Sequence, residues 1–205
     1  MHASDVPSPI DLCDPTDARE WERTAQSRPG RAEMFQAFVN QLSDLGRADL
    51  CVLDLGAGPG FLAEFLLSHL PALKMSLLDF SEPMQELAQA RLKEYALPQA
   101  RFICRSFKDP NWPQGLGTFD VVVTNQAVHE LRHKRHAEAL HRQVKGVLSP
   151  GGVYLVCDHF HGDGGMGNDQ LYMTIQEQQN ALACAGFQAV HQVHRAGTFA
   201  MHRAA

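Results

Sequence analysis

The fold of this chain is decided by the stretch Val52-Leu-Asp-Leu-Gly-Ala-Gly-Pro-Gly60. It begins with a short strand-forming run and ends in three glycines, and an apolar helical pattern starts directly after it at Phe61. Glycines between a strand and a helix let the backbone turn sharply and approach a ligand closely. A glycine-rich loop alone also fits an ordinary strand-to-helix turn. With its surroundings, the stretch predicts an α/β fold whose ligand site lies at the carboxyl end of the first strand.

The residues around these glycines restrict the kind of ligand. A dinucleotide-binding loop has its third glycine one place later, where this chain has Phe61, and Pro59 has no N–H to offer a pyrophosphate. No Lys-Ser or Lys-Thr pair follows the glycines, which excludes a mononucleotide phosphate loop. The carboxylate of Asp54 suits a ligand that carries positive charge. The loop therefore favours a ligand without phosphates.

Short apolar runs alternate with helical patterns from residue 50 onward, which predicts a parallel sheet covered by helices on both faces. The predicted strands are residues 50–55, 74–79, 101–104, 119–124 and 152–157, and the predicted helices are residues 61–69, 82–94, 134–148 and 169–185. Ser81 caps the second of these helices, with Pro83 in its first turn, and Gly186 closes the last one. Two strand-like runs around Ala196-Gly197 predict an antiparallel hairpin at the carboxyl end.

The amino-terminal part has a different composition. Residues 1–15 are rich in Pro, Ser and Asp and predict a flexible arm, and residues 16–45 carry helical signals interrupted at Arg28-Pro29-Gly30. We therefore expect an amino-terminal arm and helical cap over residues 1–45, and a ligand-binding domain over residues 46–205. A chain of 205 residues has room for one such structural unit.

Composition narrows the partners and the location. The net charge is -5 with both signs spread along the chain, which offers no extended cationic face for nucleic acid or a membrane. The sequence shows neither a signal peptide nor an apolar run long enough to span a bilayer, so a cytoplasmic location is expected. A homodimer is allowed. The five cysteines contain no Cys-x-x-Cys pair and are expected to be reduced core thiols without a metal role.

Asp79 ends the second predicted strand, about 20 residues beyond the glycine loop. From this place a carboxylate can accept hydrogen bonds from both hydroxyls of a ribose. Glycine loop, spacing and strand order then agree on a ligand that contains a nucleoside.

Five segments in this order and spacing resemble the motifs of the class I S-adenosylmethionine (SAM) dependent methyltransferases. They are VLDLGAGPG, LLDFSEPM, RFICRSFKDPNWP, FDVVVTNQAVHEL and LSPGGVYLVCD, and the likeness extends from about residue 30 to the end. The resemblance implies a Rossmann-like methyltransferase fold, a doubly wound and mostly parallel sheet of seven strands with an antiparallel carboxyl-terminal hairpin. It also implies SAM as the cofactor.

The resemblance assigns roles residue by residue. Asp54, Gly56 and Gly58 would line the methionine part, Asp79 and Phe80 the ribose and adenine, and Met84 the adenine face. Where relatives often offer adenine an acidic residue, this chain has Ser106 followed by Phe107, and a hydroxyl bonds more weakly. Asn125 and Gln126 would border the sulfonium, although a simple polar strand end is the alternative. The full expected set of cofactor-binding residues is Asp54, Gly56, Ala57, Gly58, Gly60, Phe61, Asp79, Phe80, Met84, Ser106, Phe107, Asn125 and Gln126.

His129-Glu-Leu-Arg-His133 matches the zinc-protease string His-Glu-x-x-His. That motif needs one continuous helix, whereas this string follows a buried strand at a loop-to-helix junction, so a metal site is not expected. His129 is a candidate general base for a substrate hydroxyl or amine, or alternatively a packing residue near the cofactor loop. Asp158 and His159, at the end of the fifth strand, are the further catalytic candidates, with scaffolding as the alternative.

The sequence is less informative about the methyl acceptor. Families that methylate amino groups of DNA bases resemble one another in an Asp/Asn/Ser-Pro-Pro-aromatic string, and this chain has Thr124-Asn-Gln-Ala127 at that place. A small-molecule acceptor, methylated by in-line displacement, is therefore expected. The glycine-rich loop at residues 159–167 is either a lid over that acceptor or a surface connection. A SAM-binding module without turnover, such as a partner subunit, is the alternative function.

Overall fold

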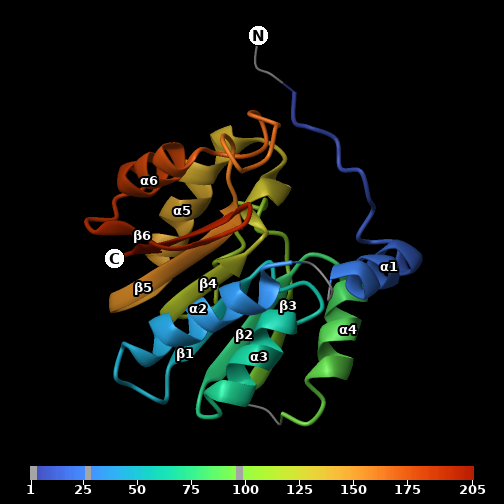
Figure 1. Ribbon diagram of the computed structural model, residues 1–205. Helices are drawn as coiled ribbons and strands as arrows, with labels where there is room; N and C mark the ends of the chain where they lie inside the picture. Colours follow the sequence, from blue (N-terminus) through green and yellow to red (C-terminus); the bar gives the residue numbers. More distant parts are fainter. Residues whose placement is uncertain (1–3, 26–28, 96–98) are drawn as a thin grey trace.

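The structure is a computed structural model that describes residues 4–25, 29–95 and 99–205, and it consists of a central sheet between two layers of helices (Figure 1). The strands are β1 (Cys51–Leu55), β2 (Lys74–Asp79), β3 (Ala100–Cys104), β4 (Phe119–Asn125), β5 (Leu148–His159), β6 (Val190–Ala196) and β7 (Phe199–Ala204). Their order is β3-β2-β1-β4-β5-β7-β6, with β1 to β5 parallel and β7 antiparallel to β5 and β6. The predicted seven-stranded fold with its terminal hairpin is confirmed.

The helices follow the sequence pattern, with corrections at their ends. They are α1 (Pro15–Ala25), α2 (Arg31–Ser43), α3 (Phe61–His69), α4 (Glu82–Arg91), α5 (Ala137–Gly146) and α6 (Ile175–Cys184), with short 3-10 turns η1 (Val128–Leu131) and η2 (Lys134–His136). The predicted helix 134–148 ends earlier because Leu148 already pairs with Phe119 as the first residue of β5. The last helix starts at residue 175 rather than 169, because Thr174 and Glu177 form a capping box there.

Neighbouring residues of the central strands serve opposite faces of the sheet. Val52 of β1 belongs to the core beneath α2, α3 and α4, whereas Leu53 belongs to the core beneath α5 and α6. Val121 and Val122 of β4 divide in the same way. Such strands are buried on both faces, which explains why they read as continuous apolar runs. None of the helices in the described part of the chain is both long and apolar enough to span a membrane.

The chain order in the sheet reverses between β1 and β4. From β1 the chain proceeds to β2 and β3 on one side, and it returns to β4 and β5 on the other. At such a switch point the loops that follow neighbouring strands diverge, and a crevice opens at the carboxyl ends. The glycine loop after β1 and the Asn125-Gln126 pair at the end of β4 both lie there.

The amino-terminal arm, for which the sequence predicts flexibility, contacts the domain at several points between residues 5 and 12. The N–H of Val6 donates to the carbonyl of Arg132 at 2.8 Å, and the Arg132 guanidinium donates to the carbonyls of Val6 at 3.0 Å and Pro7 at 2.7 Å. Farther along, the Ser81 hydroxyl donates to the carbonyl of Leu12. A Pro- and Ser-rich segment has no apolar pattern of its own, so its order depends on partners distant in sequence.

The predicted helix break at residues 28–30 and the predicted burial of the cysteines were each only partly confirmed. Of the predicted helix break at Arg28-Pro29-Gly30, Arg28 lies outside the described residues, and Gly30 has the left-handed φ of 80° directly before α2. Cys157 is buried, but Cys13, Cys104 and Cys184 are exposed free thiols, so the prediction of core thiols is wrong for these three. Cys104 ends the edge strand β3, where one face is open to solvent.

Candidate active site

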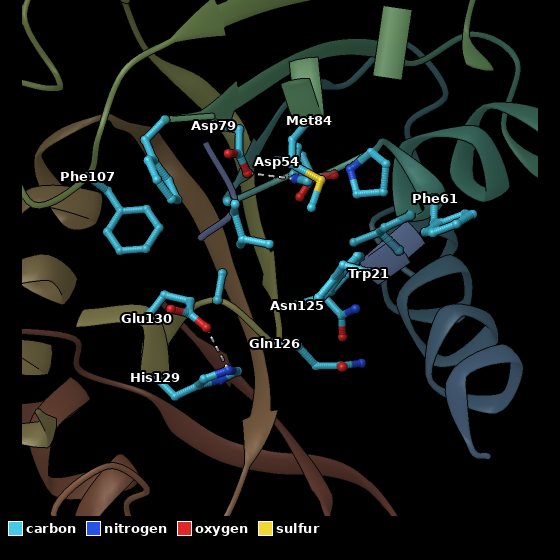
Figure 2. Close-up of a pocket in the computed structure, with 18 of the residues that line it drawn as sticks. Trp21, Asp54, Phe61, Asp79, Met84, Phe107, Asn125, Gln126, His129 and Glu130 are labelled. Atoms are coloured by element: carbon cyan, nitrogen blue, oxygen red, sulfur yellow. Dashed lines mark hydrogen bonds and ion pairs between the residues drawn. The ribbon is translucent and has the colours of Figure 1, made fainter. Parts of the chain in front are cut away.

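Carboxyl, amide and imidazole side chains face a pocket at the carboxyl ends of β1, β2 and β4 (Figure 2). The glycine loop forms one wall. The main-chain N–H groups of Gly56 and Ala57 donate to the carbonyl of Leu78 at 2.8 and 3.1 Å, and the N–H of Gly58 donates to Asp79 Oδ2 at 2.8 Å. These bonds fix the loop against β2, so its shape is set before any ligand binds.

The loop needs glycine for two different reasons. Gly56 has φ 75°, and a Cβ added there would lie 2.4 Å from the Cβ of Ala127, so a side chain cannot be accommodated. Gly58 has φ 53° with open space around it and borders the pocket. Gly60 has φ 78° and faces Ala88 of α4 instead of the pocket, so its role is close helix packing.

Two carboxyl groups form the floor. Asp54 is 1% exposed and its Oδ2 has no hydrogen-bond partner among the described residues. Burial, with a contribution from the charge of Asp79, raises the pKa of Asp54 to about 8. Burial also raises the pKa of Asp79, although the N–H groups of Ser81 and Gly58 oppose the rise. A buried pair of this kind is stabilised by a ligand that brings positive charge and hydrogen-bond donors.

Asn125 and Gln126 close the pocket at the end of β4. Gln126 has φ 58°, a left-handed conformation uncommon for a residue other than glycine, and its N–H donates to the carbonyl of Cys157 at 2.8 Å. Both polar atoms of its side chain and Oδ1 of Asn125 are buried without a hydrogen-bond partner in the described part of the chain. Strain together with unpaired polar atoms is typical of a ligand site.

Aromatic side chains stand at the two ends of the pocket. Figure 2 shows Phe107 on one side, and Trp21 and Phe61 on the opposite side, with Asp54 and Asp79 between them. Phe80, next to Asp79, is 40% exposed although it is a large apolar residue. Met84 of α4 lines the same wall. An exposed ring and a buried ring near one carboxylate offer faces on which a planar base can stack.

His129 and Asp158 form a buried pair beside this floor. Nδ1 of His129 lies 2.7 Å from Asp158 Oδ1, and the main-chain N–H of His129 donates to Asp158 Oδ2 at 2.8 Å. The other ring nitrogen lies 3.4 Å from a carboxylate oxygen of Glu130. Burial lowers the pKa of His129, but the charge and hydrogen bond of Asp158, joined by Glu130, outweigh it and raise the pKa to about 10. His129 is therefore an imidazolium at neutral pH.

The surroundings of His129 do not have the geometry of a zinc-protease helix. His129 belongs to the 3-10 turn η1, which ends at Arg132 in the left-handed conformation, φ 66°, before His133. The chain therefore changes direction between the two histidines. Within the described ranges, no three His, Cys, Asp or Glu side chains are arranged to hold a metal ion.

Three rings surround the open side next to His129. The ring centroid of His129 lies 5.9 Å from that of His159 and 5.5 Å from that of Tyr172, and the latter two are 5.7 Å apart. Nδ1 of His159 lies 2.8 Å from the Thr198 hydroxyl, which orients this ring. All three residues line the pocket. They form a partly apolar surface on which a flat molecule can rest.

The structure brings most of the expected site residues together. Those that line the pocket are Asp54, Gly56, Ala57, Gly58, Phe61, Asp79, Phe80, Met84, Phe107, Asn125, Gln126, His129 and His159. Three do not. Gly60 packs on α4, Asp158 lies behind His129, and Ser106 lines an adjacent pocket while its hydroxyl accepts the N–H of Lys108 at 3.2 Å.

Comparison with known proteins agrees with this geometry. Residues 52–152 match a family described as a methyltransferase domain. The matched residues lie within the seven-stranded sheet, and the pocket lies at the switch point of that sheet. Residues 52–152 of this chain are thus similar to methyltransferase domains in sequence.

Individual methyltransferases resemble the chain over different lengths. An uncharacterized methyltransferase of Mycobacterium tuberculosis is 30% identical over 122 residues, which cover 60% of this chain and 56% of that protein. The ribosomal RNA small subunit methyltransferase C of Klebsiella pneumoniae is 35% identical over 79 residues, which cover 38% of this chain and 22% of that protein. The chain thus spans about half or less of the length of these relatives.

A solved methyltransferase structure shows the same fold. Human N-acetylserotonin methyltransferase in complex with SAM superposes with a TM-score of 0.70 at 17% identity, covering 93% of this chain and 56% of that one. At this identity the likeness establishes the fold alone.

Several residues that line the pocket of this chain were not predicted from the sequence. Trp21, Arg31, Glu130 and Tyr172 line the pocket. Trp21 and Arg31 precede the glycine loop, and Tyr172 follows a loop after β5, so only tertiary contacts bring them to the site. Glu130 follows His129 directly, and this spacing was the one signal that could have identified it.

Proposed function

We propose that this chain binds SAM in the glycine-loop pocket and transfers its methyl group to a small-molecule acceptor. The observation that carries the proposal is the set of buried, unpaired polar atoms of Asp54, Asn125 and Gln126 beside the glycine loop. Buried polar atoms without a partner are costly, and a polar ligand offsets that cost. SAM combines the matching donors and positive charge in one molecule.

The residues present fit each part of this cofactor. Each carboxylate oxygen of Asp79 accepts one main-chain N–H, and the remaining lone pairs would accept hydrogen bonds from the ribose hydroxyls. Phe80, Phe107 and Met84 would hold the adenine, and Asp54 with Asn125 and Gln126 would border the methionine part and the sulfonium. Ser106, which stands where relatives often have an acidic residue, does not line this pocket. The next residue, Phe107, lines it instead.

A small acceptor is supported by the enclosure and charge of the site. The pocket wall formed by His129, His159 and Tyr172 presents rings, and the charge of His129 is paired with Asp158. Arg132 and Arg135, which could otherwise meet an RNA, bind the amino-terminal arm through carbonyls and Asp5. The structural neighbour named for N-acetylserotonin acts on a small molecule by its name, whereas the ribosomal RNA enzyme resembles less than half of this chain.

SAM supplies a methyl group already activated by its sulfonium, so the protein mainly orients the acceptor and excludes water. We assign the proton-handling role to His129, positioned by Asp158. His129 is an imidazolium at neutral pH. In one description, the acceptor hydroxyl has already lost its proton and binds beside the imidazolium as an anion. In the other, His129 is neutral and accepts the proton from the acceptor hydroxyl. These two descriptions contain the same total number of protons and differ only in which group holds one of them, so their rates have the same pH dependence. His159 and Tyr172 would orient the acceptor.

Calorimetric titration with SAM and with S-adenosylhomocysteine tests the cofactor. We expect both to bind, and Asp79→Asn to weaken them by about 1.5–3 kcal/mol, the range for hydrogen bonds to a charged group. Absence of binding to either compound would refute the proposal.

Methyl transfer is tested with isotope-labelled SAM and a panel of small hydroxylated, amino and thiol compounds. Turnover on a panel member supports an enzyme, whereas tight binding with no turnover on any of them favours the alternative, a SAM-binding module without activity. The homodimer and the cytoplasmic location stay predictions.

A further inference from the structure

We infer that Arg31 anchors the α-carboxylate of the cofactor's amino-acid tail. The inference deepens the proposed function and rests on it. Arg31 begins α2, well before the glycine loop in sequence, and it lines the pocket while being only 7% exposed. Among the described residues that line this pocket, it is the one arginine or lysine.

The position of Arg31 along the pocket follows from its ring contacts. Its guanidinium carbon lies 5.7 Å from the ring centroid of Trp21, 5.6 Å from that of Phe35 and 5.1 Å from that of Phe61. Trp21 and Phe61 stand opposite Phe107 in Figure 2. Arg31 therefore lies at the end of the pocket that is farthest from the expected adenine position.

The cofactor must lie along the pocket in a defined direction. Asp79 follows β2 and would bind the ribose in the middle, with adenine toward Phe107. The methionine tail then extends past the glycine loop toward Trp21 and Phe61. Its carboxylate is the one anionic group of SAM, and it reaches the end of the pocket where the arginine lies.

The charges of the pocket are distributed in agreement with this direction. Asp54 and Asp79 would lie near the parts of SAM that are cationic or donate hydrogen bonds, and Arg31 lines the same pocket beside Trp21 and Phe61. The first turn of α3, with Phe61 and Leu62, lines the same end, and helix N-termini favour negative charge. A guanidinium held among aromatic rings keeps its charge and a fixed plane, which suits two-point binding of a carboxylate.

A neighbouring arginine provides a contrast. Arg91 lies 3.9 Å from the Phe61 ring centroid, but it does not line the pocket. It forms ion pairs with Glu22 of α1 at 2.6 Å and Glu64 of α3 at 3.0 Å, and it donates to the carbonyl of Pro59. Arg91 therefore stabilises the protein from outside the pocket, whereas Arg31 lines the pocket.

The test uses two ligands that differ in one group, SAM and decarboxylated SAM, which lacks only the carboxylate. Both are titrated calorimetrically into wild-type protein and Arg31→Gln. We expect the wild type to bind SAM at least tenfold more tightly than decarboxylated SAM. Arg31→Gln should lose at least tenfold in affinity for SAM but less than threefold for decarboxylated SAM.

Arg91→Gln is the matched control, because it removes a guanidinium next to the same phenylalanine but outside the pocket. It should change the affinities for both ligands by the same factor. If Arg31→Gln fails to fold, the wild-type preference together with Arg31→Lys, which should retain part of it, decides the question. A wild-type ratio near one, or an equal loss for both ligands in Arg31→Gln, would overturn the inference.

Two outcomes separate this inference from the proposed function. A wild-type protein that binds neither SAM nor decarboxylated SAM refutes the proposed function itself. Unchanged SAM affinity of Arg31→Gln, with reduced turnover of an acceptor that carries a carboxylate, would assign Arg31 to the acceptor and overturn the inference while the proposed function stands.

Discussion

The imidazole of His129 and the carboxylate of Asp158 are joined across 29 residues of sequence by a contact of 2.7 Å between Nδ1 and Oδ1. Asp158 also accepts the main-chain N–H of His129, so it fixes both the ring and the turn that carries it. Burial raises the pKa of Asp158, but the charge of His129 outweighs burial and holds it below its usual range. The two residues therefore form a buried ion pair.

Asp158→Asn should lower the pKa of His129 from about 10, because burial then acts on the imidazolium without its main partner and Glu130 is the anionic partner that stays. Titration of the ring by NMR measures this change. On a hydroxyl acceptor we expect turnover to fall about 100-fold or more, in the range for a displaced acid–base group. Glu130→Gln, whose contact to His129 is 3.4 Å, should have a smaller effect on the pKa.

The contribution of Asp54 to the stability of the ligand-free protein should fall as the pH rises from about 4 to about 8, whereas the buried His141 and His202, whose pKa values burial lowers, act in the opposite direction below about pH 6.5. Asp54 has a pKa of about 8 in the folded protein and an ordinary value when unfolded, so in this range the folded state binds one proton more. Its contribution is at most about 1.4 kcal/mol per pH unit. Denaturant unfolding should show that the stability of the wild type relative to Asp54→Asn falls as the pH rises through this range. Parallel curves would contradict the buried titration of Asp54.

The affinity for SAM should rise over the same pH range. A cationic ligand favours the ionised form of Asp54, so binding at pH 7 displaces its proton. Calorimetry in buffers with different ionisation enthalpies should detect that proton release, and Asp54→Asn should abolish most of it. The idea fails if binding at pH 7 releases no proton from the wild type.

Two glycine substitutions should separate folding from binding. Gly56→Ala combines a positive φ with a contact of 2.4 Å to Ala127, and we expect it to cost about 3 kcal/mol of stability or more. Gly58→Ala has a positive φ but open space, so it should cost about 1–2 kcal/mol. Because Gly58 borders the pocket, its variant should fold and still bind SAM more weakly. Thermal unfolding with and without SAM measures both effects.

Arg132→Ala should loosen the amino-terminal arm. The variant removes the guanidinium bonds to Val6 and Pro7, and hydrogen exchange of the Val6 amide should become at least tenfold faster. Arg135→Ala, which removes the ion pair with Asp5, is the control and should affect that amide less. Equal protection of Val6 in all three proteins would show that Arg132 does not hold the arm.

Much of the fold could be predicted because its signals are local. The apolar strands, the Ser81 cap, the glycine loop and the terminal turn at Gly197 are each encoded within a few residues. The errors in the bounds of helices and strands were at element ends, where distant pairing decides, as when Leu148 joins Phe119 and starts β5 early. The expected cofactor residues are mostly strand ends, and these meet at one sheet edge in any parallel fold.

The sequence by itself therefore determined the alternation of strands and helices, the glycine loop and the carboxylates at the strand ends, because backbone preference and burial act over short segments. Tertiary structure decided the rest. It paired His129 with Asp158, bound the arm to Arg132 across 126 residues and brought Arg31 to the far end of the pocket. These contacts depend on how packed elements meet in space, and no local pattern of residues records that.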